Sequence, residues 1–161
     1  MRPFWRNDLS DPQGASPVAD STVYFDDVSV GDAAPSKSYT LTRTDLVKYA
    51  GASGDFNPMH HDDVQATAAG LPSVFGHGMY SAGLVATALT DYVGLGSLTR
   101  YKVRFAKQTW PGDVLTTAVT VTGTREEDGK HLVDLDCQLT NQDGVAVVVG
   151  EATAALPVRA S

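Results

Sequence analysis

The chain has few of the residues that disulfides, thiolate metal sites and nucleic-acid binding require. Cys137 is the only cysteine among 161 residues, so an intramolecular disulfide and a cysteine-rich metal site are excluded. Lys and Arg number 12 against 19 Asp and Glu, and no run of basic residues occurs. Because phosphate binding needs clustered cations, nucleic acid is not expected as a partner. We expect Cys137 to be a buried structural thiol, since its neighbours alternate in polarity.

Long apolar runs are also missing. No stretch approaches the roughly 18 apolar residues of a membrane-spanning helix, and residues 1–8 lack the apolar segment of a secretory signal. We therefore expect a cytoplasmic protein that does not enter a membrane. The hydrophobic fraction of 42% is typical of a globular protein, and the length suits one domain with its own core.

The chain divides into a leader and a domain. Residues 1–22 are rich in Pro, Ser, Asp and Ala without periodicity, which predicts an N-terminal extension. The domain spans residues 23–158. Within it, capping and apolar spacing predict helices over about 42–53, with Thr42 or Thr44 as N-cap, and over 62–69 and 79–92. The third helix has mostly small residues and almost no charge, which indicates burial on most sides.

Period-two alternation follows the third helix. It predicts strands over about 101–105, 114–124, 131–140 and 145–156, after a short strand over 37–41. Asp128-Gly129 and Asp143-Gly144 are hairpin signals between these strands. The fold class is therefore α+β, with a curved antiparallel sheet wrapped around one long helix.

An acid/base pair follows the first predicted helix. Asp55 and His60 lie on either side of Asn57-Pro58, a turn-forming pair stiffened by the proline ring. An imidazole accepts protons near neutral pH, and a nearby carboxylate can orient the ring or a water molecule. The motif is short, and its spacing alone favours a turn-capping Asp55 and a packed or solvated His60.

Gly76-His77-Gly78 directly precedes the long helix. Helix N-termini expose unpaired N–H groups, so the amide of Gly78 can stabilise a developing oxyanion, although a glycine chosen for its backbone angle is an equal alternative. His77 is a weak candidate, because capping or packing is the simpler role. His60 and His61 have no helical metal-ligand spacing, so no metal is expected. Neither a serine-hydrolase elbow nor a phosphate loop occurs.

Several segments together resemble one family. Residues 49–60 (YAGASGDFNPMH), then 76–79 (GHGM), Arg104-Phe105 and 110–113 (WPGD) are similar to the motifs of the MaoC-like, (R)-specific enoyl-CoA hydratase family, in the same order. The resemblance covers roughly residues 24–156. It implies a single hot-dog domain, in which a long helix is wrapped by an antiparallel sheet. It also implies a homodimer, or a heterodimer with a related subunit.

The resemblance further implies a chemistry. Asp55 and His60 would hold a water and add it reversibly to a trans-2-enoyl thioester of coenzyme A or acyl carrier protein, giving the (3R)-hydroxyacyl product in fatty-acid or related lipid metabolism. Gly78 would bind the thioester oxygen and Asn57 would support the loop, with no cofactor. Many members carry a serine about two turns into the helix; here that region is 83–86 (GLVA), so Ser81 is a weak substitute.

Weaker candidates and alternatives remain at this stage. Arg104 and Lys107 are weak candidates for coenzyme A or carrier phosphates, and a solvated strand face is the simpler explanation. A thioesterase on the same fold and a non-catalytic partner subunit are alternative functions; a non-catalytic subunit is expected to lack Asp55 or His60, and both are present. The acyl chain length is not readable from the sequence.

Overall fold

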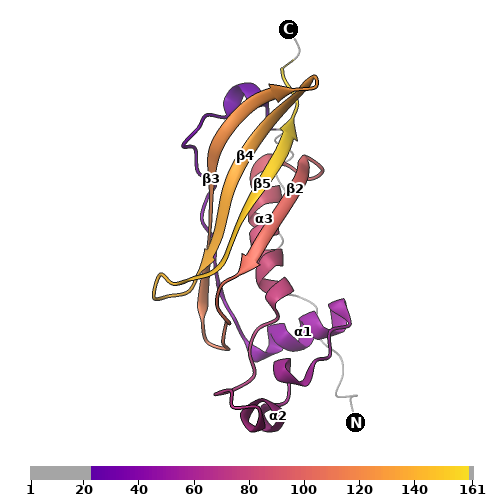
Figure 1. Ribbon diagram of the computed structural model, residues 1–161, viewed down its shortest axis with the longest axis vertical. Coiled ribbons are helices and arrows are strands. Elements are labelled where there is room, and N and C mark those ends of the chain that lie inside the picture. The colour runs from indigo at the N-terminus through magenta and orange to yellow at the C-terminus, as the bar shows by residue number, and fades with distance from the viewer. Residues whose placement is uncertain (1–22, 160–161) are drawn as a thin grey trace, which may run out of the picture.

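The computed structural model describes residues 23–159, and within them a five-stranded antiparallel sheet curves around one long helix (Figure 1). The strand order is β1-β3-β4-β5-β2. The strands are β1 (Ser38–Thr40), β2 (Leu98–Phe105), β3 (Val114–Glu127), β4 (Lys130–Thr140) and β5 (Ala146–Leu156). The helices are α1 (Arg43–Ser53), α2 (Asp63–Ala68) and α3 (Gly78–Val93), with 3-10 turns η1 (Phe25–Asp27) and η2 (Pro58–His60).

This arrangement confirms the predicted α+β class. The predicted extension, residues 1–22, lies outside the described residues. No helix of residues 23–159 is long and apolar enough to span a membrane.

Helix α3 packs its apolar side against the inner face of the sheet. Val85, Leu89 and Val93 are almost fully buried, and they meet the inward-facing residues of β3 and β4, such as Val119 and Leu135. The prediction of burial on most sides is confirmed except for one stripe, because the other residues of α3 are buried or partly buried. Residues at i+4 spacing on the other side are exposed: Met79, Gly83, Thr87 and Asp91.

Tight turns connect the long strands. Asp128 and Gly129 both have positive φ, 51° and 72°, as a two-residue type I′ hairpin requires. The predicted hairpin is confirmed, and β3 runs three residues beyond the expected Thr124, to Glu127. The alternation is lost there because Arg125 and Glu127 are exposed on a paired ribbon that extends past the core.

The helices α1 and α2 and the turn η2 lie at one end of the sheet, below it in Figure 1. Their N-termini are capped by their own sequence. Thr42 and Asp45 form a reciprocal capping box at α1, and the Asp62 carboxylate accepts from Val64 and Gln65 at α2. An ion pair between Arg43 and Asp63 (2.8 Å) joins the two helices.

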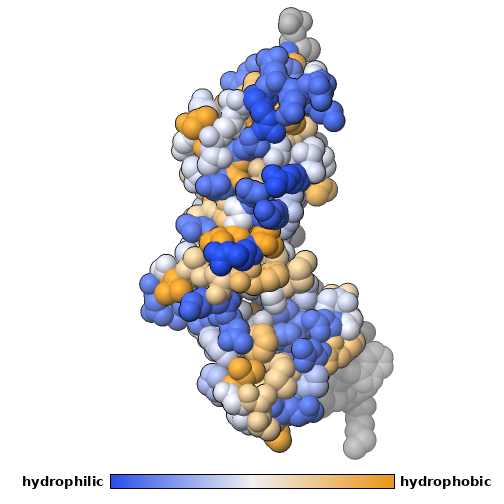
Figure 2. Space-filling view, in the orientation of Figure 1, coloured by the Kyte–Doolittle hydropathy of each residue, from blue (hydrophilic) through white to orange (hydrophobic). Residues whose placement is uncertain are grey.

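One long edge of the sheet has no partner strand among residues 23–159. Strand β2 pairs with β5 on one side only, whereas at the other edge β3 is covered by β1 and by the segment before it. Figure 2 shows the molecule from the same side as Figure 1. Polar residues cover its upper part, and a band of apolar residues crosses its middle, at the height where β2 ends in Figure 1. Phe105, at that end of β2, is 50% exposed.

Candidate active site

The loop between α1 and η2 presents Asp55. Helix α1 ends at Gly54, whose φ of 76° is a left-handed conformation that favours glycine. The Asp55 carboxylate then accepts the backbone N–H of Asn57 (3.2 Å), and the Asn57 side chain accepts the N–H of Met59 (3.1 Å). Pro58 occupies the first position of η2, where no N–H is needed. Asn57 therefore shapes the loop on both sides, as expected for a supporting residue.

His60 faces Asp55 with a defined tautomer. Its Nδ1 lies 2.8 Å from the carbonyl oxygen of Phe75. Because a carbonyl only accepts, Nδ1 carries the proton and Nε2 of the neutral ring keeps its lone pair. Nε2 lies 3.9 Å from the Asp55 carboxylate. The His60 side chain is 7% exposed and that of Asp55 is 51% exposed, so a buried imidazole faces a solvent-accessible carboxylate.

Two acceptors at this separation repel each other unless a donor lies between them. A water molecule offers two O–H groups and can reach each acceptor at about 2.8 Å. The pair therefore fits a bound water that donates to both groups. The pair can accept a proton from that water and orient the water oxygen for attack.

His77 is the second buried imidazole of the site. It is 1% exposed, and its ring stacks on that of His60 with a centroid distance of 3.9 Å and an interplanar angle of 30°. Its Nε2–H donates to the backbone carbonyl of Asp55 (3.2 Å), which leaves Nδ1 as a buried acceptor without a partner among the described residues. Burial lowers the pKa of His77, a shift that the hydrogen bond to Asp55 opposes and nearby His60 reinforces.

Gly78 begins α3 beside this pair. As the first helical residue it has an N–H without an intrahelical acceptor, at the positive end of the helix dipole. A cavity of about 430 Å³ opens there, and Gly78, Ser81, Phe105 and Lys107 are among the residues that line it. A Cβ at Gly78 would come within 3.3 Å of the Phe105 ring, so glycine keeps this wall open.

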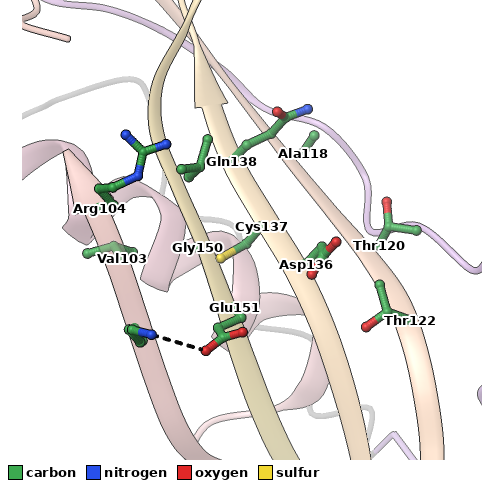
Figure 3. A pocket seen from close by; sticks show the side chains of 12 residues that line it. Val103, Arg104, Ala118, Thr120, Thr122, Asp136, Cys137, Gln138, Gly150 and Glu151 are labelled. Atoms are coloured by element: carbon green, nitrogen blue, oxygen red, sulfur yellow. Dashed lines mark ion pairs between the residues drawn. The ribbon is translucent and has the colours of Figure 1, made fainter. Parts of the chain in front are cut away.

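The structure separates the two weak phosphate candidates. Lys107 is exposed beside the cavity. Arg104 instead lines a larger hollow of about 720 Å³, built from residues of β2 to β5 (Figure 3). That hollow shares no lining residue with the cavity at Gly78, and an ion pair of Lys102 with Glu151 (3.7 Å) crosses it. Neither hollow is lined by Asp55, His60 or His77, and only the smaller one includes Gly76 and Gly78, the residues on either side of His77.

Cys137 is buried, as expected. Burial, followed by the nearby carboxylates of Asp136 and Glu151, raises the pKa of its thiol to about 11. A thiol that stays protonated at neutral pH is a poor nucleophile and a poor metal ligand. The buried position and the raised pKa support a structural role.

The candidate pair is spaced more widely than the ligands of a tetrahedral metal site, since Asp55 and His60 lie 3.9 Å apart. Asp55, His60 and His77 each offer one ligand atom, and these atoms lie within 4.8 Å of one another. Tetrahedral Zn²⁺, with bonds of about 2.0–2.1 Å, needs ligand atoms about 3.3 Å apart. One nitrogen of each ring is bound to a carbonyl, which leaves one nitrogen of each ring as a ligand atom.

Two supporting aromatic residues were not predicted. Tyr49 packs on His77 (4.9 Å between centroids), and Phe75 lies edge-on to His60 (4.8 Å) in addition to binding its Nδ1. Phe75 immediately precedes Gly76-His77-Gly78, and this adjacency is the only sequence signal for it. The contact of Tyr49 with His77 joins residues 28 positions apart and has no local signal.

Fold and site together define a hot-dog domain in which a carboxylate, Asp55, faces an imidazole, His60. The model of the MaoC like domain matches residues 29–142, more than half of the chain. The chain belongs to the MaoC-like dehydratase family, as the motifs indicated.

Known relatives agree in sequence and in structure. The chain is 33% identical over 138 residues to the (R)-specific enoyl-CoA hydratase of Rhodospirillum rubrum, a match covering 84% of this chain and 93% of that protein. It is 27% identical to the mitochondrial 3-hydroxyacyl-[acyl-carrier-protein] dehydratase of Arabidopsis thaliana, over 88% and 83% of the two chains. The unliganded R-hydratase PhaJ1 of Pseudomonas aeruginosa superposes with a TM-score of 0.75 at 28% identity, covering 86% and 88%.

Proposed function

We propose that this protein is a hydro-lyase that adds water reversibly to a trans-2-enoyl thioester and gives the (3R)-hydroxyacyl thioester. The observation that carries the proposal is the pair of facing acceptors, Asp55 and His60, separated by 3.9 Å. The space between these two acceptors has the size and polarity of a water site. The names of the related hydratase and dehydratase indicate that both act on thioesters of this kind.

The reaction follows from the placement of the proton acceptors. A water between Asp55 and His60 loses a proton to Nε2 of His60 as its oxygen bonds to C3 of the enoyl group. The C2–C3 double bond opens toward the thioester, whose oxygen becomes enolate-like and accepts the Gly78 N–H. A proton from the same pair then bonds to C2 on the same face. The sum is one water added, and dehydration reverses each step.

Substitution of the acid/base pair tests this function. Asp55→Asn and His60→Gln keep the size of each group and remove its acid/base role, so hydration of crotonyl-CoA should fall by about 100- to 10,000-fold each. The measurement is the loss of enoyl absorbance, followed with a thiol reagent present.

Asp136→Asn, on an exposed position of β4, and His131→Gln, on a partly exposed one, are the matched controls and should keep wild-type rates. Wild-type rates in the Asp55 and His60 variants would contradict the proposal. Release of free thiol from acyl-CoA would indicate a thioesterase instead.

We propose coenzyme A or acyl carrier protein as the carrier, with Lys107 beside the cavity as the candidate cation for its phosphates. We also propose that a second hot-dog chain, either another copy or a related subunit, pairs along the free edge of β2. The unpaired backbone of that strand and the exposed Phe105 at its end support this pairing.

A further inference from the structure

We propose that His77 is a positioning residue for the hydration, holding the main chain of Asp55 and the ring of His60 in register through one imidazole. This inference rests on the proposed function, because it gives His77 a task only if Asp55 and His60 act together. His77 itself is 1% exposed. It acts through its two neighbours and not through contact with the substrate.

The first contact fixes Asp55. Its carboxylate is half exposed, in a loop that begins immediately after the left-handed Gly54. The hydrogen bond from the His77 Nε2–H to the Asp55 carbonyl (3.2 Å) ties this loop to the start of α3, 22 residues away. Without that donor, a partly buried hydrogen bond to the Asp55 carbonyl is lost and the carboxylate is free to move relative to His60.

The second contact fixes His60. The His77 ring covers one face of the His60 ring at 3.9 Å, and Phe75 meets the same ring edge-on. Tyr49 supports His77 from another side. The hydrogen bond from Nδ1 to the Phe75 carbonyl fixes the rotation of the His60 ring within its own plane. The stacking on His77 fixes the orientation of that plane. Both are needed to keep Nε2 directed at the Asp55 carboxylate.

His77 is also adjacent to Gly78, the proposed oxyanion donor. His77 is the N-cap residue of α3, so the side chain that holds Asp55 and His60 belongs to the residue that precedes the Gly78 amide. Its ring also has to stay neutral when His60 takes a proton, since two stacked cations would repel. Burial favours the neutral form of His77. One residue thereby links the acid, the base and the amide.

Two variants separate the donor from the ring. His77→Gln keeps an amide N–H near the position of Nε2 but has no ring; His77→Phe keeps a flat ring without a donor. We expect each variant to lose about 10- to 100-fold in kcat with KM within about twofold, because each removes one of the two contacts and a displacement of about 1 Å at the reacting groups costs that much.

Circular dichroism and the thermal midpoint establish that each variant is folded. Wild-type kcat in either variant, or a rise in KM with kcat unchanged, would overturn the positioning role.

A spectroscopic measurement on the wild-type protein decides the matter even if a variant does not fold. In protein labelled with ¹⁵N-histidine, His77 should be the neutral Nε2–H tautomer at pH 7, and His60 the Nδ1–H tautomer. An Nδ1–H or doubly protonated His77 would overturn the proposal. This result does not depend on turnover, so failure of the hydratase assignment in the Asp55→Asn assay is distinguishable from failure of the positioning role.

Discussion

His60 and His77 carry the same side chain in opposite tautomers, and each tautomer is set by a backbone carbonyl. His60 donates from Nδ1 to Phe75, and His77 donates from Nε2 to Asp55. The first leaves a lone pair facing the carboxylate, and the second leaves a lone pair buried against other side chains. The difference between the proposed base, His60, and the proposed support, His77, therefore depends on one hydrogen bond in each case.

At the same scale, two glycines of α3 give a prediction. A Cβ at Gly78 meets the Phe105 ring at 3.3 Å, whereas one at Gly83 meets nothing within 4 Å. We expect Gly78→Ala to lower kcat/KM for crotonyl-CoA about tenfold or more, because the cavity wall and the amide must shift. Gly83→Ala is the control and should keep activity within about twofold while gaining up to about 1 kcal/mol in unfolding free energy.

Steady-state kinetics and urea unfolding of the two variants measure both quantities. An active Gly78→Ala variant with unchanged kcat/KM would argue against an oxyanion role for that amide.

At the scale of elements, the helices that carry the site begin and end where their sequences specify. The predicted ends of α1 and α2 are confirmed to within about one residue, because caps act over three or four positions and leave a local signature. The choice between Thr42 and Thr44 was open in the sequence. The structure selects Thr42, since its side chain pairs reciprocally with Asp45.

The capping box at α1 can be tested with its neighbour as a control. Thr42→Ala removes the side chain that accepts the Asp45 N–H, and should lower the free energy of unfolding by about 1 kcal/mol. Thr44→Ala changes an exposed helical residue and should stay within about 0.5 kcal/mol of wild type. Urea denaturation monitored by circular dichroism gives both values. Equal losses in the two variants would show that the cap contributes no more than an ordinary surface threonine.

At the scale of the whole molecule, the sheet has one protected edge and one open edge. At the protected edge, strand β1 pairs with β3 although it is only three residues long. Ala33 forms a further bridge to Thr120 of β3. Strand β2 is eight residues long and has no partner on its outer side in the part of the chain that the structure describes. Long unpaired edges are sites where another chain adds, which is the basis of the proposed dimer.

Hydrogen exchange tests this edge without any substitution. We expect a mass in solution of twice the 17.0 kDa of one chain, and amide protection in 98–105 that rises with protein concentration. The opposite edge, 38–40, is the internal control and should exchange at a rate independent of concentration. A monomeric mass with unprotected amides throughout β2 would contradict pairing along this strand.

The sequence by itself determined the class of fold, the positions of the elements and the identity of the candidate pair Asp55 and His60. These follow from signals that act over a few residues: alternation, caps, hairpin dipeptides and a compact motif. Only the tertiary structure decided that His77 stacks on His60 and holds Asp55, that Arg104 lines a hollow away from the cavity, and that one side of α3 is exposed. Those outcomes depend on contacts between segments distant in the chain. Local sequence patterns do not specify which distant segments come into contact.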